Sequence, residues 1–257
     1  MNALPAEEPI DETGFLARKV TLRQPRRGHR AGTDAALVVA AARPYAKGRI
    51  ADLGAGVGAI GLSLAVLDPK LEVMLVEIDP LLARLAGEAA TANGLGGRLH
   101  VVNEDVRALA TSPRRRMVAA ASCDLIVMNP PFTNSRERQA SPDPLRAKAH
   151  VMQEGELALW VDAAETLLRP NGAFVLIHRP EALEEVLGAL RQSFGSIALR
   201  PVQPRADRAA TRVLLFARKG ARAPLSILPS LVLHEAGGAF TPLAADIHRG
   251  EIELPFA

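Results

Sequence analysis

A short segment after an apolar run carries side chains that could hold a planar amino group. The run LIVM ends at Met128, and Asn129, Pro130, Pro131 and Phe132 follow. The Asn129 side-chain oxygen and the Pro130 carbonyl are hydrogen-bond acceptors, and the prolines fix the direction of that carbonyl. Phe132 offers a flat face for stacking. The pattern predicts a catalytic site that accepts hydrogen bonds from a conjugated amine and acts mainly by orienting its nitrogen. The alternative is a strand that merely ends on prolines.

A glycine-rich turn is the second candidate site. The segment DLGAGVGAIG places Gly54, Gly56, Gly58 and Gly61 directly after Asp52. Glycines let the chain turn sharply and let a ligand approach the backbone. The spacing of the last three glycines matches a dinucleotide fingerprint. Asp52 and the extra Gly54 favour a cationic cofactor instead, because a carboxylate repels a pyrophosphate, and S-adenosylmethionine carries a sulfonium and an ammonium.

Two further acids end the next two predicted strands. Glu77 lies 19 residues after Gly58, and Asp105 closes the run LHVVNED. We expect Glu77 to hold ribose hydroxyls and Asp105 to accept from the adenine amino group of the cofactor. Each acid taken singly could be a helix cap or a surface charge. Since the carboxyl ends of parallel strands meet at one edge of a sheet, the acids and the glycine turn together predict a cofactor site.

Alternating runs predict the elements that position these residues. Strands are expected over 49–53, 71–78, 99–105, 125–128 and 172–178 and in the runs SIALRPVQ and TRVLLFARKG, with helices over 57–67, 80–93, 156–170 and 180–193. Such alternation requires a mostly parallel sheet with right-handed crossovers. The predicted fold class is α/β, a doubly wound, mostly parallel, seven-stranded Rossmann-like sheet with an antiparallel C-terminal strand pair.

Composition limits the class of protein and its compartment. The 257 residues are 48% hydrophobic, no window is apolar enough for a membrane helix, and the acidic start is unlike a signal peptide. We therefore expect a cytoplasmic protein. Cys123 is the single cysteine, which excludes an internal disulfide, and it has no partner at zinc-ligand spacing, so no metal is expected. It is expected to be a small buried hydrophobe at the start of a strand.

Charge is distributed unevenly along the chain. Lys and Arg outnumber acids nine to one over 18–49, seven to three over 114–148 and seven to one over 200–222. Such segments are typical of a surface that binds a polyanion, although they can also be solvated surface. We divide the chain into a flexible tail (1–14), a basic cap (15–48), the main domain (49–222) and an irregular C-terminal extension (223–257) that packs on the same domain.

The sequence resembles a known group of enzymes. The NPPF segment resembles the (D/N/S)PP(Y/F) motif of methyltransferases that modify adenine N6, guanine N2 or a glutamine amide nitrogen. The segment GHRAGTDAALVVAAA (28–42) is similar to the "GTD…LL" segment of bacterial tRNA adenine-N6 methyltransferases, which act on A37 of tRNA(Val), and RAKAH (146–150) and RVLLFARKG fit the same group. The resemblance covers roughly residues 15–240 and implies a class I methyltransferase. NPPF replaces the commoner NPPY and the following loop is long and Arg-rich, so the exact base stays open.

The resemblance also implies site residues. Gly32, Thr33 and Asp34 would close over the methionine end of S-adenosylmethionine, with Thr33 and Asp34 as a helix N-cap pair the alternative, and Asn129 would border the cofactor as well as the acceptor. The expected contacts to nucleic acid are Arg26, Arg27, Arg30, Arg136, Arg138, Arg146, Lys148 and His150.

Three hypotheses follow for function. The first is an S-adenosylmethionine-dependent methyltransferase of an adenine N6 in structured RNA, with tRNA as the partner and the base extruded into the NPPF pocket. The second is methyl transfer to guanine N2, a protein glutamine or a small-molecule hydroxyl. The third is a nicotinamide-dependent oxidoreductase or an inactive nucleotide-binding module. The sequence is compatible with a monomer or a homodimer.

Overall fold

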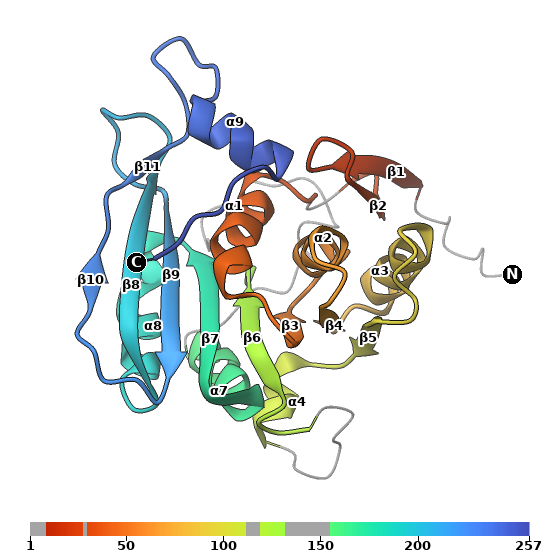
Figure 1. Cartoon of the computed structure of the whole chain (residues 1–257), viewed down its shortest axis with the longest axis horizontal. Helices are drawn as coiled ribbons and strands as arrows, with labels where there is room; N and C mark the ends of the chain where they lie inside the picture. Colours follow the sequence, from red (N-terminus) through yellow and green to blue (C-terminus); the bar gives the residue numbers. More distant parts are fainter. Residues whose placement is uncertain (1–8, 28–29, 112–118, 132–154, 257) are drawn as a thin grey trace, which may run out of the picture.

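Apolar strands alternate with helices along the chain and build one central sheet (Figure 1). The computed structural model describes residues 9–27, 30–111, 119–131 and 155–256. Across this part of the chain the sheet runs in the order β10-β8-β9-β7-β6-β3-β4-β5, with β11 also paired to β8. Its strands are β3 (Arg49–Leu53), β4 (Glu72–Glu77), β5 (Leu99–Asn103), β6 (Cys123–Met128), β7 (Leu168–His178), β8 (Phe194–Gln203), β9 (Arg212–Lys219), β10 (Ser226–Ile227) and β11 (Leu231–Val232).

The strand directions confirm the predicted fold class. Strands β3 to β7 pair in parallel, whereas β9 is antiparallel to both β7 and β8. Seven long strands form the predicted sheet, and the two-residue strands β10 and β11 extend it beside β8. Strands β8 and β11 therefore end at the same edge as β6. This is the carboxyl edge, where open α/β sheets bind ligands.

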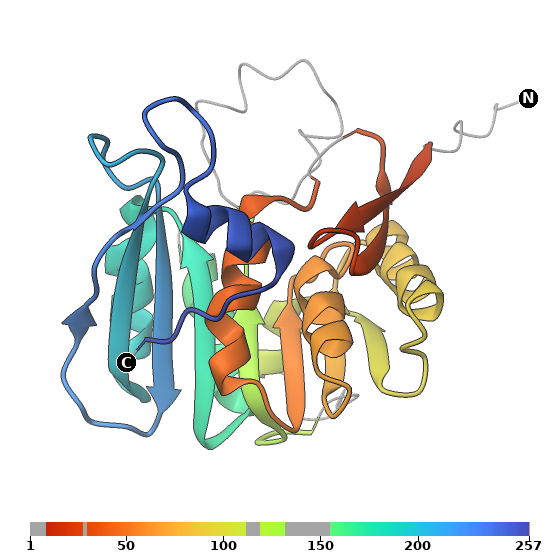
Figure 2. The ribbon, with the colours of Figure 1, turned by 45° about the horizontal axis from the view of Figure 1, so that its top comes forward.

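Helices cover both faces of the sheet, and each face has its own apolar core (Figure 2). Along β6, Leu125 and Val127 join one core while Ile126 and Met128 join the other, as the two-residue period of a strand requires. Helices α1, α2 and α3 cover the first face, and α4, α7 and α8 cover the second. The helices are α1 (Thr33–Ala42), α2 (Ala59–Leu67), α3 (Pro80–Ala92), α4 (Val106–Thr111), α7 (Glu156–Leu167), α8 (Leu183–Leu190) and α9 (Pro242–Arg249), with 3-10 turns η1 (Arg43–Tyr45) and η2 (Pro180–Ala182).

Several expected boundaries shift by a few residues. Helix α7 ends at Leu167 because β7 begins at Leu168, four residues before the strand expected at Gly172. Asn171 adopts a left-handed backbone, φ +62°, within that strand. The helix expected over 180–193 divides into η2 and α8. Cys123 is fully buried at the start of β6, as expected. No helix in the described part of the chain is long and apolar enough to cross a membrane.

The N-terminal tail is shorter than the expected 1–14. Residues from Ile10 onward form an antiparallel hairpin of β1 (Ile10–Phe15) and β2 (Val20–Pro25). The hairpin is fixed to α3 by Asn93, whose side chain accepts from Thr21 N at 2.9 Å and donates to Thr21 O at 2.7 Å. The expectation was wrong for residues 10–14 because their weak apolar alternation gains stability from pairing with β2, which local pattern alone does not reveal.

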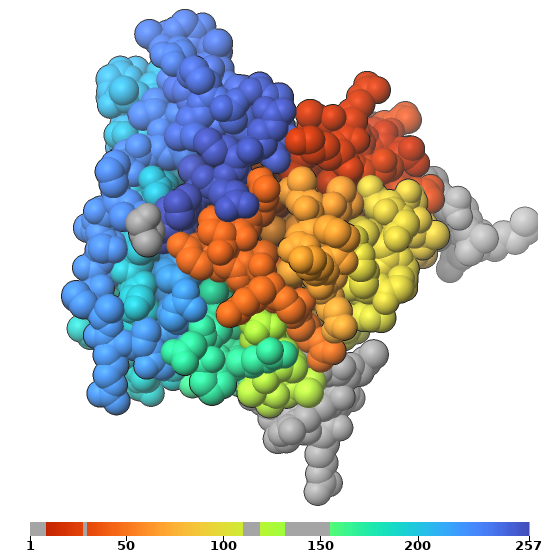
Figure 3. Space-filling view, in the orientation of Figure 1, coloured from red at the N-terminus to blue at the C-terminus, as the bar shows by residue number. Residues whose placement is uncertain are grey.

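The C-terminal extension is more regular than the expected irregular segment. It contains β10, β11 and helix α9, whose start is set by Thr241: the Thr241 hydroxyl accepts from Ala244 N at 3.2 Å, and Pro242 occupies the first turn. Helix α9 packs on α1, and its last residue, Arg249, accepts through its carbonyl from Lys19 of the hairpin turn at 2.8 Å. Figure 3 shows the extension in blue beside the N-terminal hairpin in red, over the ends of α1 and α2.

Candidate active site

Two carboxylates accept backbone hydrogen bonds from the glycine-rich segment after β3 and stabilise its turn. Asp52 accepts from Gly61 N at 2.9 Å, and Glu77 accepts from Gly56 N at 2.7 Å. Gly56 has φ +57° and a side chain added there would meet no atom within 4 Å, so the turn is open on that side. Gly54 has φ +71°, and an added Cβ would lie 2.5 Å from the Trp160 ring of α7. The left-handed backbone of Gly54 and Gly56 therefore favours glycine at both positions. At Gly56 the backbone also stays accessible to a ligand.

Burial perturbs both carboxylates. Asp52 is 1% exposed, and its burial raises its pKa to about 7, against the opposing hydrogen bond from Gly61; the nearby charge of Glu77 also raises it. Burial likewise raises the pKa of Glu77, although hydrogen bonds from Asp79 N and Gly56 N lower it. A cation bound at this turn would relieve the repulsion between the two acids. Asp52 lies beneath the turn, and supporting the turn is a role that the sequence analysis did not assign to it.

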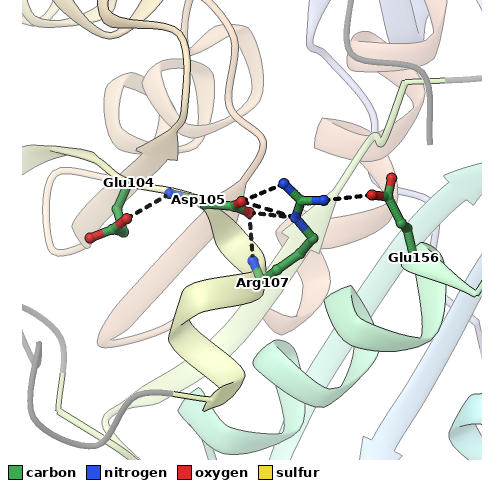
Figure 4. A network of polar contacts seen from close by, with 4 residues as sticks. All are labelled: Glu104, Asp105, Arg107 and Glu156. Carbon is green, nitrogen blue, oxygen red and sulfur yellow. Dashed lines mark hydrogen bonds and ion pairs between the residues drawn. The ribbon is translucent and has the colours of Figure 1, made fainter. Parts of the chain in front are cut away.

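Asp105 is part of an ion-pair network at the end of β5 (Figure 4). Its carboxylate accepts from Arg107 Nε at 2.9 and 3.0 Å and from Arg107 Nη2 at 2.6 Å. The other guanidinium nitrogen of Arg107 donates to Glu156 at 2.5 Å, and these carboxylates raise the pKa of Arg107. An adenine amino group at Asp105 would share an oxygen that Arg107 already uses. Arg107 thereby orients Asp105 and joins it to the first turn of α7.

Asn129 lies between the ends of the two neighbouring parallel strands. Met128 before it pairs with Leu53 of β3 and with Leu176 of β7. The Asn129 Oδ1 atom is buried and has no hydrogen-bond partner among the residues that the structure describes. A buried acceptor without a partner is destabilising by about 1–3 kcal/mol. Its placement fits the predicted catalytic role, because a ligand amino group would supply the missing donor; Pro130 is buried beside it and Pro131 half-buried.

The N-terminus of α1 is tied to the C-terminal part of the chain. Gly32 is the N-cap and no side chain caps the helix, so Thr33 and Asp34 do not form the alternative capping pair. The Thr33 hydroxyl lies 3.3 Å from His248 Nε2 of α9, and Asp34 accepts from Arg212 of β9 at 2.9 Å. Helix α1 begins at the carboxyl edge of the sheet, on the same side as Asn129. The predicted contact of Gly32, Thr33 and Asp34 with a cofactor stays a prediction.

The predicted nucleic-acid contacts divide into two groups. Arg26 and Arg30 both pair with Asp11 of β1, at 3.0 and 3.1 Å, while Arg27 is exposed next to them. A single carboxylate thus organises the basic end of the hairpin. Outside the described residues lie Phe132, Arg136, Arg138, Arg146, Lys148 and His150.

The sequence of the chain matches the model of a known protein family. The model of the methyltransferase small domain matches residues 30–201, from just before α1 into β8. The chain belongs to this family. The methyltransferase is 31% identical to a tRNA1(Val) (adenine(37)-N6)-methyltransferase of Porphyromonas gingivalis W83, over 91% of this chain and 88% of that one. It is 29% identical to the enzyme of the same name from Aeromonas hydrophila, over 89% of this chain and 92% of the other.

A solved structure resembles the methyltransferase over most of its length. A predicted O-methyltransferase of Agrobacterium tumefaciens is 28% identical, with a TM-score of 0.72, and the match covers 86% of this chain and 98% of the other. The protein is thus an S-adenosylmethionine-dependent methyltransferase, as predicted, and the oxidoreductase hypothesis is wrong. Within the described residues no group of three or more His, Cys, Asp or Glu could hold a metal ion.

The residues present fit this cofactor. The turn is open at Gly56, and the two buried acids beneath it favour a positive charge. When bound, S-adenosylmethionine supplies an electrophilic methyl carbon on a sulfonium. The chain's part is to bind and orient: Asp52 and Glu77 shape the turn, Asp105 is held by Arg107, and Asn129 presents an acceptor.

Sequence reasoning missed the residues that hold the predicted ones in place. Arg107, Glu156, Arg212 and His248 were not identified because each acts through a partner distant in the sequence or on another element. One signal was available, since an arginine two residues after Asp105 at a helix start can fold back onto the acid. Nothing in the sequence indicates the other three contacts.

Proposed function

We propose that this methyltransferase modifies the N6 amino group of an adenine in structured RNA, specifically position 37 of a tRNA(Val). The observation that carries the proposal is the buried Oδ1 of Asn129 at the carboxyl edge, which has no hydrogen-bond partner within the described part of the chain. It accepts a hydrogen from a donor of the substrate, and two prolines follow it. The names of the curated relatives support the target, since both act on adenine 37 of tRNA1(Val).

The chemistry of an aromatic amine explains the residue types. The lone pair of an exocyclic amine is delocalised into the ring, so the nitrogen is a weak nucleophile. Asn129 Oδ1 and the Pro130 carbonyl each accept one of its hydrogens, which returns electron density to the nitrogen and fixes its direction. The proton leaves after the methyl group has arrived, so no side-chain base must ionise the amine first. Orientation supplies most of the rate gain.

The name of the structural neighbour points to a different acceptor. It is a predicted O-methyltransferase, and a hydroxyl acceptor needs a general base to remove its proton. An amide cannot serve as that base, so Asn129 favours nitrogen. Guanine N2 and a glutamine amide offer the same pair of hydrogens as adenine N6. They are the competing outcomes of the test.

Two observations support RNA as the substrate: the basic segments of the chain, and the need for the target base to leave its stack. The segments 18–49 and 200–222 together hold sixteen Lys or Arg and two acids, which suits a phosphate backbone. An adenine reaches Asn129 only when it leaves its stack, as it does readily in an unpaired loop. We place the reaction in the cytoplasm, where tRNA is found.

The test is methylation of unmodified tRNA transcripts by the purified enzyme with labelled S-adenosylmethionine. Nucleosides from the product are separated and identified by mass spectrometry. The proposal expects N6-methyladenosine in the tRNA(Val) transcript and none when A37 is replaced by G. Labelled N2-methylguanosine, or label in protein alone, would replace the proposed acceptor. Absence of label in every RNA would refute the substrate class.

A further inference from the structure

Three rings of the C-terminal extension pack against one another. The centroids of His234 and Phe240 are 4.8 Å apart with an interplanar angle of 23°, and those of Phe240 and His248 are 4.4 Å apart at 36°. Phe240 is 41% exposed, and it is the one aromatic among the exposed large apolar side chains of the described residues. An exposed phenyl ring in contact with two imidazoles is a feature that the fold itself does not require.

The backbone holds these rings in fixed positions. His234 and Phe240 form an antiparallel bridge, closed by Glu235 N donating to Ala239 O at 2.9 Å. The turn between them contains Gly238 at φ +88°. Thr241, next to Phe240, donates its hydroxyl to Val232 O at 2.9 Å. The ring cluster (His234, Phe240 and His248) is therefore formed before any ligand arrives, which reduces the entropy lost on binding.

The ring cluster spans two parts of the carboxyl edge. At one end His234 Nδ1 lies 3.1 Å from Pro204 O, at the root of the loop that joins β8 to β9. At the other end His248 Nε2 lies 3.3 Å from the Thr33 hydroxyl at the start of α1. Figure 2 shows α9 over the end of α1, beside the β8–β9 loop. The cluster thus lies at the same edge of the sheet as Asn129.

Charge and packing indicate the kind of partner. The β8–β9 loop exposes Arg205 and Arg208, and its segment is the one with seven Lys or Arg and one acid. The apolar packing of α9 is already provided by Ala244 and Ile247, which are 0% and 1% exposed, so Phe240 is not needed for it. Flat rings beside cations suit a nucleobase next to its phosphates better than an apolar peptide.

We infer that the ring cluster stacks with an unpaired base of the RNA that flanks the methylated adenine. The inference rests on the proposed function and adds a second recognition point to it. Base stacking does not depend on the identity of the base, so the cluster would contribute affinity and position the loop, while Asn129 selects the amine.

The test compares Phe240 variants with a matched change at Leu243, on the helix α9 that follows. An anticodon stem–loop RNA carries 2-aminopurine beside the target adenine, and its fluorescence reports stacking on the protein. Phe240→Ala and Phe240→Leu should weaken RNA binding by about 5- to 150-fold and reduce the change in fluorescence, and Phe240→Tyr should retain both. Leu243→Ala, at a 37% exposed position of α9, should bind RNA like the parent. Affinity for S-adenosylhomocysteine should stay the same in all four.

The outcomes separate this inference from the proposed function. If Phe240→Ala binds the stem–loop as tightly as the parent, the inference is wrong and RNA methylation stands. If Phe240→Leu binds the stem–loop as tightly as the parent, apolar packing and not stacking accounts for the contribution of Phe240, and the inference is again wrong. If the parent neither binds nor methylates RNA, and binds a protein at this edge instead, both the inference and the proposed function fail.

Discussion

Replacing Asp52 with asparagine should change how the stability of the ligand-free protein depends on pH. Asp52 is fully buried, and its carboxylate accepts from Gly61 N at 2.9 Å beneath the glycine turn. An asparagine keeps the acceptor and removes the charge. In the wild type, burial and the neighbouring Glu77 raise the pKa of Asp52 to about 7.

The raised pKa determines the sign and the size of the effect. In the unfolded chain an aspartate loses its proton near pH 4, whereas folded Asp52 keeps it until about pH 7. The folded state therefore binds more protons between these values, and stability is lost as pH rises through this window. Each pH unit corresponds to about 1.4 kcal/mol, so between pH 5 and pH 8 the wild type should lose about 3 kcal/mol that Asp52→Asn keeps.

Urea denaturation of both proteins at pH 5 and pH 8, without cofactor, measures this difference. The free energy of unfolding of Asp52→Asn relative to the wild type should rise by about 3 kcal/mol between the two pH values. Asp207→Asn, whose side chain is 73% exposed, is the control and should show no such change. An equal difference between Asp52→Asn and the wild type at both pH values would refute the assignment of Asp52 as a buried acid with a raised pKa.

Three further changes test other parts of the site. Asn129→Ala should lower kcat on the order of 100-fold in steady-state assays while the Kd for S-adenosylhomocysteine is unchanged; an equal loss of cofactor affinity would contradict a role in orienting the acceptor. Arg107→Gln should weaken S-adenosylhomocysteine binding about 10-fold in calorimetry because Asp105 loses its orienting partner, whereas Arg84→Gln, in an exposed ion pair, should not. Gly54→Ala should lower thermal stability by about 1–3 kcal/mol, because its Cβ would meet Trp160, and Gly237→Ala should be neutral.

The sheet and its order of elements were predictable because the local pattern carries them. The run LIVM before Asn129 and the run VMLV before Glu77 are apolar on both faces, which a strand covered by helices on both sides requires. The turn at Gly56 was predictable for the same reason, since only glycine adopts that backbone readily. Once the carboxyl ends of the parallel strands are identified, the residues that follow these strands are expected to lie at the same edge of the sheet.

The N-terminal hairpin shows where local pattern fails. Residues 10–15 carry two acids and only two apolar side chains, so they resemble a tail. They become a strand because Asn93 fixes Thr21 of the neighbouring strand to α3, 72 residues away in the sequence. The same limit applies to Asp11: its role is to hold Arg26 and Arg30, and no spacing rule connects an acid to two arginines across a turn.

The C-terminal extension is the strongest case for contacts that sequence cannot show. Its prolines suggested an irregular segment, yet Pro242 begins a helix because Thr241 caps it. Through His248 this helix reaches Thr33, 215 residues earlier, at the point where the cofactor is predicted to be closed in. The position of Thr33 therefore depends on α9, so the extension contacts a predicted site residue although no motif lies in it. A motif can identify the residues that meet a ligand, whereas the partners that hold them are visible only in the folded chain.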